Sequence, residues 1–410
     1  MLNDLTKIQK KIVSVILIST LFNAVLIGLG PLMDIIATKA LGAADWQLTL
    51  LVMIWPVTNF VSIWWGKILE SSENKSIFYW IVAFFGRLIF VLGIWVMTMN
   101  QFLVLLAVSF SFNSLFIPLY NNLFQKHFDS KIRGKIFGLT ISLSTLIVII
   151  FSYIAGRILD SDENSFRIIM VFAGISGFLG TAILSTFKPE IKTKNHVKKF
   201  NFHRIFISPL SRTWETLKKN KDFRNFEINF TIYGFGFIMV LPSIPIYLIE
   251  HLEMTYTSSF IAKAIIAQIG LLLLSPLFGK IHGKWHPHYF TAISFLTFSM
   301  FPLTLYISTF TSADVAIILV FAAYFIYSFG MAGVNITWNI SSIFFAGKED
   351  SSMYQSIHVS ATGIRGLLAP LLGLFIYRIF GVELVFLVSF LFIFTGSIMS
   401  YRSYLKRSRK

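Results

Sequence analysis

Long runs of apolar residues, separated by short polar segments, repeat along the whole chain of 410 residues. Each run is about as long as an α-helix must be to cross a hydrocarbon layer of roughly 30 Å. The runs lie near residues 12–38, 48–66, 76–98, 101–125, 136–159, 166–187, 223–249, 257–279, 289–309, 314–342, 353–379 and 382–401. The pattern predicts twelve transmembrane helices.

The composition agrees with a membrane protein. The chain is 55% hydrophobic and only 13% charged, which is too apolar for a soluble protein of this length. The first run is longer than a signal-peptide core and leads into another span, so we expect it to remain uncleaved. The sequence contains no cysteine, which excludes disulfides, thiolate metal sites and thiol catalysis.

The charges are distributed unevenly between the two sides of the predicted membrane. The formal net charge is +16, and most of the 35 Lys and Arg residues lie in the two tails and in every second loop. The other loops carry most of the acids, such as Asp45, Asp160, Glu250 and Asp314. This positive-inside pattern predicts that both termini are cytoplasmic. The basic excess therefore indicates orientation and contact with anionic membrane lipid, and no nucleic-acid partner is expected.

One long polar segment, residues 188–222, divides the spans into two sets of six. We therefore predict an N-terminal six-helix bundle over residues 1–187, a basic cytoplasmic linker over 188–222 and a C-terminal six-helix bundle over 223–410. Within the linker, Phe206, Leu210, Trp214 and Leu217 fall on one helical face among basic residues. This spacing predicts a short amphipathic helix on the membrane surface.

The two halves carry similar landmarks at nearly constant offsets. GKI at 66–68 recurs at 279–281, Pro31 corresponds to Pro245, and Asn122 corresponds to Asn339, with offsets of 213, 214 and 217 residues. Transporter sites lie near the midplane where such repeats meet and where Gly or Pro interrupts a helix. The interrupted helices are predicted to be the first (GLGPL), the seventh (GFGFIMVLPSIP) and the eleventh (LLAPLLG).

At this point the sequence resembles the major facilitator superfamily of transporters over essentially its whole length. The resemblance implies an all-α integral membrane fold with twelve transmembrane helices in two pseudo-symmetric six-helix bundles around a central cavity. The loop GKILESSENK and the stretch RGKIFG carry it, although the second copy, GKIHGKWHPH, has Gly283 where the family has an acid. The residues of this cytoplasmic gating signature are Gly66, Glu70, Lys75, Arg133, Gly134 and Gly279.

Two arginines, Arg87 and Arg365, lie about midway along their predicted spans, where a charge is costly and therefore suggests function. No carboxylate lies at that depth, and the nearest acids are Asp34 and Glu227. Unmatched cations favour an anionic or zwitterionic solute, because guanidinium binds carboxylate or phosphate through paired hydrogen bonds. Static structural pairing is the alternative for both, and for Arg87 it would involve backbone carbonyls or Asn113.

The polar residues of the spans complete the candidate site. His358, Thr362 and Arg365 share one helical face and form a polar stripe. Asparagines inside membranes also pack helices together, which is the alternative for each amide. The candidate substrate-binding residues are Asn23, Asp34, Arg87, Asn113, Asn122, Gln268, Asn335, Trp338, Asn339, His358 and Arg365. We interpret His282, His286 and His288 as a solvated basic loop, and we expect no metal and no cofactor.

The sequence thus predicts a secondary transporter that moves a small organic solute by alternating access. The solute is expected to be anionic or zwitterionic; an exporter of hydrophobic compounds is the alternative, because 44 Phe and 9 Trp could line an apolar cavity. By the same resemblance, the fourth span lacks the arginine of drug/proton antiporters, and the fifth span lacks their glycine-proline pattern. Multidrug export by that route is therefore not favoured.

Coupling to a proton or ion would use Asp34, Glu227 or His358. A membrane-embedded enzyme is disfavoured because no acid cluster or large loop is present, and a sensor because no signalling domain is attached. We expect a monomer in the bacterial inner membrane.

Overall fold

The computed structural model describes residues 6–71, 75–128, 130–186, 208–282, 284–346 and 351–408, and inside some helices it describes the backbone alone. These residues form α-helices with short 3₁₀ and π-helical stretches and no strand. The chain divides into unit 1, Met1–Gly42 with Val61–Asn201, and unit 2, Ala43–Phe60 with Phe202–Lys410. This grouping departs from the predicted division, because the first half of α3 (Asp45–Ser71) belongs to unit 2.

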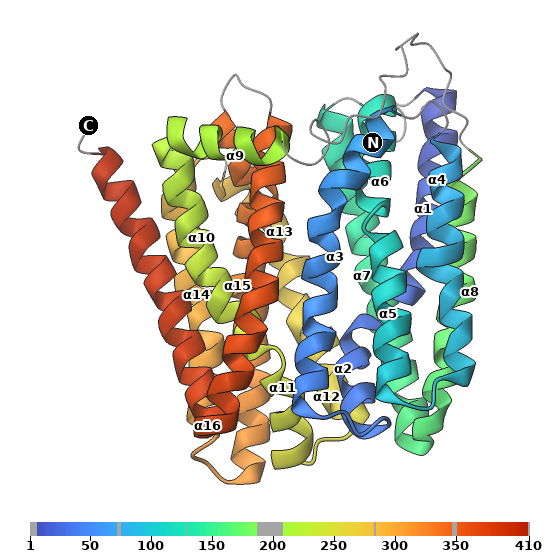
Figure 1. Ribbon diagram of the computed structural model, residues 1–410, viewed down its shortest axis with the longest axis vertical. Helices are drawn as coiled ribbons and strands as arrows, with labels where there is room; N and C mark the ends of the chain where they lie inside the picture. The colour runs from blue at the N-terminus through green and yellow to red at the C-terminus, as the bar shows by residue number, and fades with distance from the viewer. Residues whose placement is uncertain are drawn as a thin grey trace. The chain divides into compact units, whose positions relative to one another are not determined.

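Unit 1 is built from the N-terminal helices and the second half of α3 (Figure 1). The helices are α1 (Lys7–Ile27), α2 (Gly30–Lys39), α4 (Ser76–Ile81), α5 (Met99–Asn113), α6 (Phe116–His127), α7 (Ser130–Ser161) and α8 (Phe166–Leu184). A π-helical stretch, Val82–Arg87, and a 3₁₀ stretch, Leu88–Trp95, continue α4 as one span. α1 packs along both α7 and α8.

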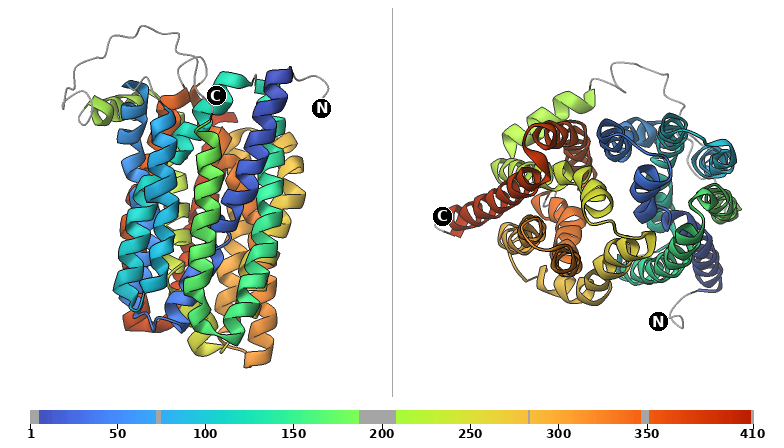
Figure 2. Two further views of the ribbon diagram at one scale, coloured as in Figure 1. Left: turned by 90° about the vertical axis from the view of Figure 1, so that its right-hand side faces the viewer. Right: turned by 90° about the horizontal axis from the view of Figure 1, so that it is seen from below.

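Unit 2 contains the C-terminal helices. They are α9 (Ser208–Lys219), α10 (Lys221–Val240), α11 (Ser243–Ile246), α12 (Tyr256–Phe260), α13 (Ala267–His282), α14 (Pro287–Ser308), α15 (Ala313–Ala346) and α16 (Ser351–Ser408). π-helical stretches, Tyr247–His251 and Ile261–Ile266, follow α11 and α12. α10 packs along α16, and α14 packs against α15 and α16 (Figure 2).

Two of the three predicted helix interruptions are confirmed. The first span breaks between α1 and α2, with Pro31 in the first turn of α2, and the seventh breaks between α10 and α11 at Pro242. The prediction for the eleventh span was wrong, since the helix continues through Pro370 and becomes non-helical at Gly381, where φ is 83°. Positive φ is open to glycine without strain, whereas a neighbouring helix can compensate for one missing N–H at a proline.

Hydroxyl side chains join the helices within each unit. In unit 1, Ser152 of α7 donates to the carbonyl of Gly28 at 2.8 Å, which is the carbonyl beside the α1–α2 break. In unit 2, Ser389 donates to the carbonyl of Gly236 at 2.7 Å and Ser397 to that of Ala292 at 2.7 Å. Backbone groups in a membrane must be satisfied inside the protein, so these contacts stabilise close helix packing.

The lengths of the helices show a multi-pass membrane protein. Among the described residues, nine helices are long and apolar enough to cross a membrane, and α5 is a shorter apolar helix. One of the nine, Ile357–Arg407, spans 51 residues and contains the break at Gly381, so it holds two of the predicted spans. The count of twelve remains a prediction.

The predicted amphipathic helix of the linker is present in part. α9 ends in the basic residues Lys218 and Lys219, and Trp214 on it is 72% exposed. Leu217, one turn further along the helix, packs against the apolar core of unit 2. α9 lies across the ends of the neighbouring helices of its unit (Figure 1), while Phe206 lies outside the described residues.

Candidate functional site

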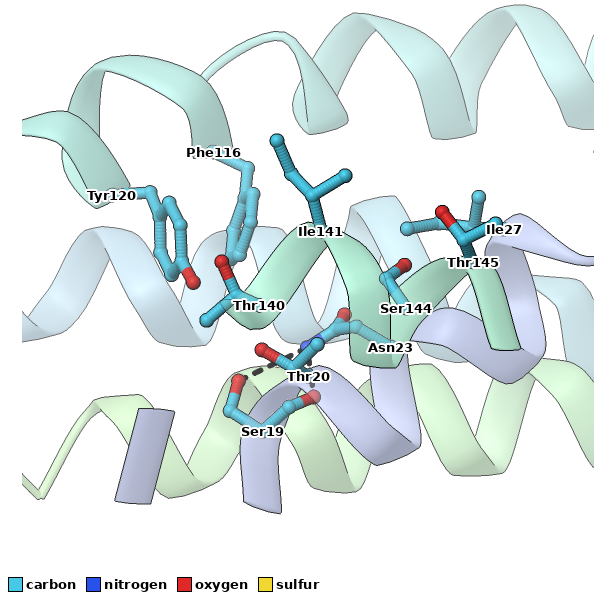
Figure 3. A pocket seen from close by; sticks show the side chains of 10 residues that line it. All are labelled: Ser19, Thr20, Asn23, Ile27, Phe116, Tyr120, Thr140, Ile141, Ser144 and Thr145. Carbon is cyan, nitrogen blue, oxygen red and sulfur yellow. Dashed lines mark hydrogen bonds between the residues drawn. The ribbon is translucent and has the colours of Figure 1, made fainter. Parts of the chain in front are cut away.

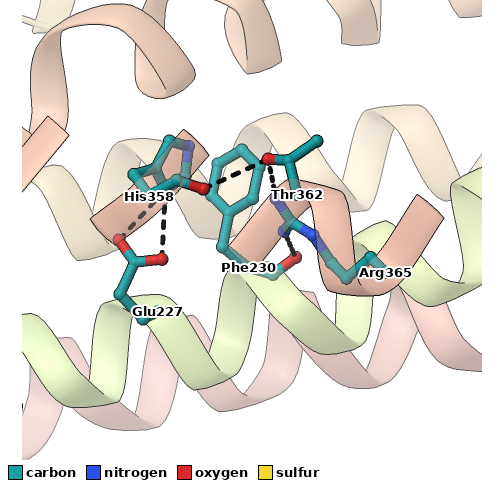
Figure 4. Close-up of polar contacts among 5 residues, drawn as sticks. All are labelled: Glu227, Phe230, His358, Thr362 and Arg365. Atoms are coloured by element: carbon teal, nitrogen blue, oxygen red, sulfur yellow. Dashed lines mark hydrogen bonds and ion pairs between the residues drawn. The ribbon is translucent and has the colours of Figure 1, made fainter. Parts of the chain in front are cut away.

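A buried carboxylate and a buried imidazole meet inside unit 2. Glu227 lies two turns into α10, which begins after the N-cap Asn220, and His358 lies two turns into α16. Nδ1 of His358 is 3.0 Å from Oε1 and 3.1 Å from Oε2 of Glu227. The glutamate is 5% exposed and the histidine is fully buried (Figure 4). An ionised carboxylate only accepts hydrogen bonds, so Nδ1 is the donor.

Aromatic rings enclose the histidine of this pair. Phe230 meets the imidazole edge to face at 4.6 Å between ring centroids, and Phe226 and Trp338 contact it at 5.8 and 5.7 Å. Nε2 of His358 is buried and has no hydrogen-bond partner among the described residues. The pair therefore lies among apolar and aromatic side chains, where an unpaired charge is costly.

Arg365 lies two turns further along the same face of α16. Its Nη1 donates to the carbonyl oxygen of Phe230 at 2.6 Å, and its Nη2 donates to Oγ1 of Thr362. Thr362 in turn donates to the carbonyl of His358 at 3.2 Å. The guanidinium carbon lies 5.2 Å from the centroid of the Phe230 ring. These contacts, drawn in Figure 4, connect Arg365 to the carboxylate–imidazole pair through one helix face.

The arginine fits against α10 because that helix carries glycine at 234. A Cβ atom at this position would lie 2.6 Å from Cδ and 2.9 Å from Nε of Arg365. Arg365 is 2% exposed, and its Nε has no hydrogen-bond partner in the described part of the chain. The side chain of Arg365 thus packs tightly between α16 and α10.

The expectation that the membrane arginines have no acid nearby is corrected for Arg365. Glu227 interacts electrostatically with it, as well as bonding to His358. The sequence placed Glu227 near the start of its helix, away from the arginines, whereas the residue is buried next to the aromatic core of unit 2. The phenylalanines at 223, 226 and 230, which share its side of the helix and are all buried, were the signal for its burial.

Arg87 has a different environment, inside unit 1. It ends the π-helical stretch and is 5% exposed, and its guanidinium carbon lies 5.1 Å from the centroid of the Phe116 ring. Within the described residues it forms no ion pair and no hydrogen bond to Asn113, whose amide oxygen is buried without a partner. Gly177 of α8 leaves room for its side chain, since a Cβ there would approach Cδ to 3.3 Å.

Asn23 and Asp34 make local contacts. Asn23 donates to the carbonyl and hydroxyl of Ser19 and accepts from Thr181 at 3.0 Å, so its amide joins α1 to α8. Oδ1 of Asp34 accepts from the N–H of Ile35 at 2.9 Å. Helix packing thus accounts for the buried amide.

The remaining candidates lie apart or outside the description. Asn335 is exposed, Gln268 is half-buried, and Trp338 contacts His358 as described. Lys75 immediately precedes α4. The described part of the structure does not include the side chains of Asn122, Asn339, Gly66, Glu70, Arg133, Gly134 and Gly279. The structure therefore brings His358 and Arg365 together with Glu227, which the candidate set omitted.

Of the three histidines predicted to lie in a solvated loop, His282 and His288 are buried and His286 is partly buried. His282 contacts Ser341 at 3.0 Å, and His286 caps α14 by accepting from the N–H of His288 at 3.2 Å. Burial lowers the pKa of His282 and of His286, which favours neutral rings. The sequence interpretation was wrong because the basic residues around them suggested solvent. The described residues include no group of three or more potential metal ligands.

A membrane protein built from apolar helices, with ionisable residues paired inside one unit, belongs to the class of polytopic proteins that handle solutes or ions. The family model of the Major Facilitator Superfamily matches residues 12–357, and the chain belongs to this family. No match was found among curated proteins.

Solved transporters share the fold at low identity. The nucleoside transporter NupG (D323A mutant) superposes with a TM-score of 0.72 at 12% identity, over 95% of this chain and 98% of its own. A structure from work on proton-dependent oligopeptide transporters gives 0.68 at 13%, over 98% of both chains. A D-xylose-proton symporter gives 0.69 at 14%, over 95% of this chain and 96% of its own. Family and fold point to a transporter and not to an enzyme.

Proposed function

We propose that the protein is a secondary transporter that couples the movement of a small organic solute to protons through the Glu227–His358 pair. Alternating access of a central cavity between two pseudo-symmetric six-helix bundles, with twelve spans in all, is part of the proposal. So is a bacterial inner membrane location with both termini cytoplasmic, which the positive-inside pattern supports.

The observation that carries the coupling proposal is the buried contact between Glu227 and Nδ1 of His358. Imidazole changes charge near neutral pH, and buried carboxylate and histidine groups in membrane helices serve as proton relays. Nε2 of His358, which has no partner in the described part of the chain, is the atom at which a proton enters or leaves. Gaining that proton turns the charged carboxylate and neutral ring into an ion pair.

For the solute we favour a zwitterion or an anion. Arg365 and Glu227 provide opposite charges along one helix–helix contact, and a zwitterion presents the complementary arrangement. The guanidinium of Arg365 has fewer N–H groups left for a solute than the sequence suggested, because it already donates to Phe230 and Thr362. Export of hydrophobic compounds is the alternative outcome.

The test is proton flux in proteoliposomes. Solutes are first selected by thermal stabilisation of the purified protein, using anionic, zwitterionic, cationic and neutral amphipathic compounds. Adding a selected solute outside the vesicles should then alkalinise the medium, and Glu227→Gln should abolish this signal while solute exchange continues. Glu250→Gln, which changes an acid outside this site, is the matched control. Unchanged proton movement in Glu227→Gln would refute the coupling role.

A further inference from the structure

Unit 1 contains a cavity that the proposed coupling site does not use. It lies among α1, α6 and α7 and has a volume of about 220 Å³ (Figure 3). Pockets for drug-sized ligands measure roughly 300–1,000 Å³, so this cavity has room for a single ring. Ile141, which borders it, is 52% exposed, so the cavity is open at the surface of the unit.

The lining of the cavity is polar and uncharged. Of the ten described residues that form it, seven carry a hydroxyl or an amide group and none carries a charge. An anion or cation would lose its hydration there without gaining a countercharge, which is unfavourable. A neutral ligand with several hydroxyl groups could exchange its hydrogen bonds with water for bonds to these side chains.

Two of the hydroxyls are available for a ligand. The amide of Asn23 is fully engaged with Ser19 and Thr181, and the hydroxyl of Tyr120 interacts with Thr20 and Thr140. The hydroxyls of Ser144 and Thr145, on α7, have no hydrogen-bond partner among the described residues. They border the cavity side by side in Figure 3.

An aromatic wall accompanies these hydroxyls. The rings of Phe116 and Tyr120 on α6 are stacked, with centroids 5.3 Å apart and an angle of 20° between their planes. Both rings line the cavity (Figure 3). A few polar groups that fix orientation beside an apolar or aromatic surface are typical of small-molecule sites.

We propose that this cavity is a subsite for a neutral ring that bears hydroxyl groups, with Ser144 and Thr145 as its free hydrogen-bonding partners and Phe116 and Tyr120 as its aromatic wall. The inference rests on the proposed function, since it assigns the uncharged part of the transported solute to unit 1.

The test titrates the full-length protein in detergent with probes that differ mainly in charge. Glucose and myo-inositol are neutral, glucuronate is anionic and glucosamine is cationic. A neutral probe should raise the melting temperature, and the double variant Ser144→Ala with Thr145→Val should weaken its binding by about tenfold, the effect of losing two hydrogen bonds. Ser142→Ala, an exposed residue of the same helix outside the cavity, should leave binding unchanged.

The contrary results are distinct. Stabilisation by charged probes only, no stabilisation by either neutral ring, or equal affinity in the double variant would each overturn the subsite. If the double variant does not fold, Thr145→Cys gives a single thiol in a chain without cysteine, and a neutral probe should protect it from a water-soluble maleimide. Failure of the proton signal in the vesicle experiment would remove the coupling proposal and leave this binding result standing.

Discussion

At the scale of single residues, the site depends on one small side chain as much as on the charged ones. Arg365 reaches the carbonyl of Phe230 only because position 234 on α10 carries no Cβ. The sequence showed the polar stripe of His358, Thr362 and Arg365, and the structure confirms that these residues contact one another along α16. The sequence did not reveal that α10 supplies both Glu227 and the space at Gly234, because contacts between distant segments have no local signal.

Gly234→Ala is expected to lower the stability of the protein. The added methyl group would displace the guanidinium from its carbonyl acceptor, and overpacking of this kind costs on the order of 1–3 kcal/mol. In an ordinary helix position the same change is favourable by roughly 0.5–1 kcal/mol. Gly30→Ala is the control, since a Cβ there meets nothing within 4 Å. Thermal unfolding of both purified variants tests this prediction. An equal change in melting temperature would contradict tight packing of Arg365 against Gly234.

At the scale of elements, α3 is the helix that the sequence described least well. The pattern predicted one ordinary span, whereas its first half packs with unit 2 and its second half with unit 1. Asp45, at its start, accepts from Nε of Arg378 at 2.9 Å and from Nη2 at 3.1 Å. Pro56 is so close to α16 that a Cβ on Gly366 would lie 1.9 Å from it. Such packing is invisible to hydrophobic periodicity.

The attachment of the start of α3 to α16 is expected to depend on pH only under acidic conditions. The hydrogen bond from Arg378 lowers the pKa of Asp45 below its usual value near 3.9. The stabilisation is therefore complete above about pH 4 and is lost as the pH falls through the lowered pKa. The protection factor of the first turn of α3, which is the intrinsic exchange rate at each pH divided by the observed rate, should stay constant from neutral pH down to that range and then fall.

Asp45→Asn should lower the protection factor of the first turn of α3 already at neutral pH. Asp222→Asn, which removes an exposed ion pair with Arg407, is the matched control and should leave α3 unchanged. An unchanged protection factor in Asp45→Asn would show that apolar contacts alone attach the start of α3 to α16.

At the scale of the whole molecule, composition and periodicity predicted the membrane class and most of the helices, and the resemblance carried by GKILESSENK and RGKIFG predicted the family. Composition and periodicity succeeded because hydrocarbon imposes one length and one backbone structure on every span. They could not predict the partner of His358, the break at Gly381 in place of Pro370, or the burial of His282, because these depend on which helices become neighbours.

A cross-link between the start of α3 and α16 should stop transport. In this chain without cysteine, Asp45→Cys with Arg378→Cys provides one thiol pair in place of the ion pair. Under the alternating-access proposal, a short bifunctional thiol reagent should reduce flux at least severalfold, and a cleavable reagent should allow recovery on reduction. Either single variant treated in the same way serves as the control, and full flux in the cross-linked protein would show that this contact persists throughout the cycle.

The division of α3 between two compact units has a mechanical consequence. A helix resists bending wherever its backbone hydrogen bonds are intact, and Pro56 removes one of them near the point where α3 passes from unit 2 to unit 1. Any movement of one unit against the other must therefore flex α3 near this proline or peel its first half from α16. Under the alternating-access proposal, the stiffness of this single helix then contributes to the rate of the conformational change.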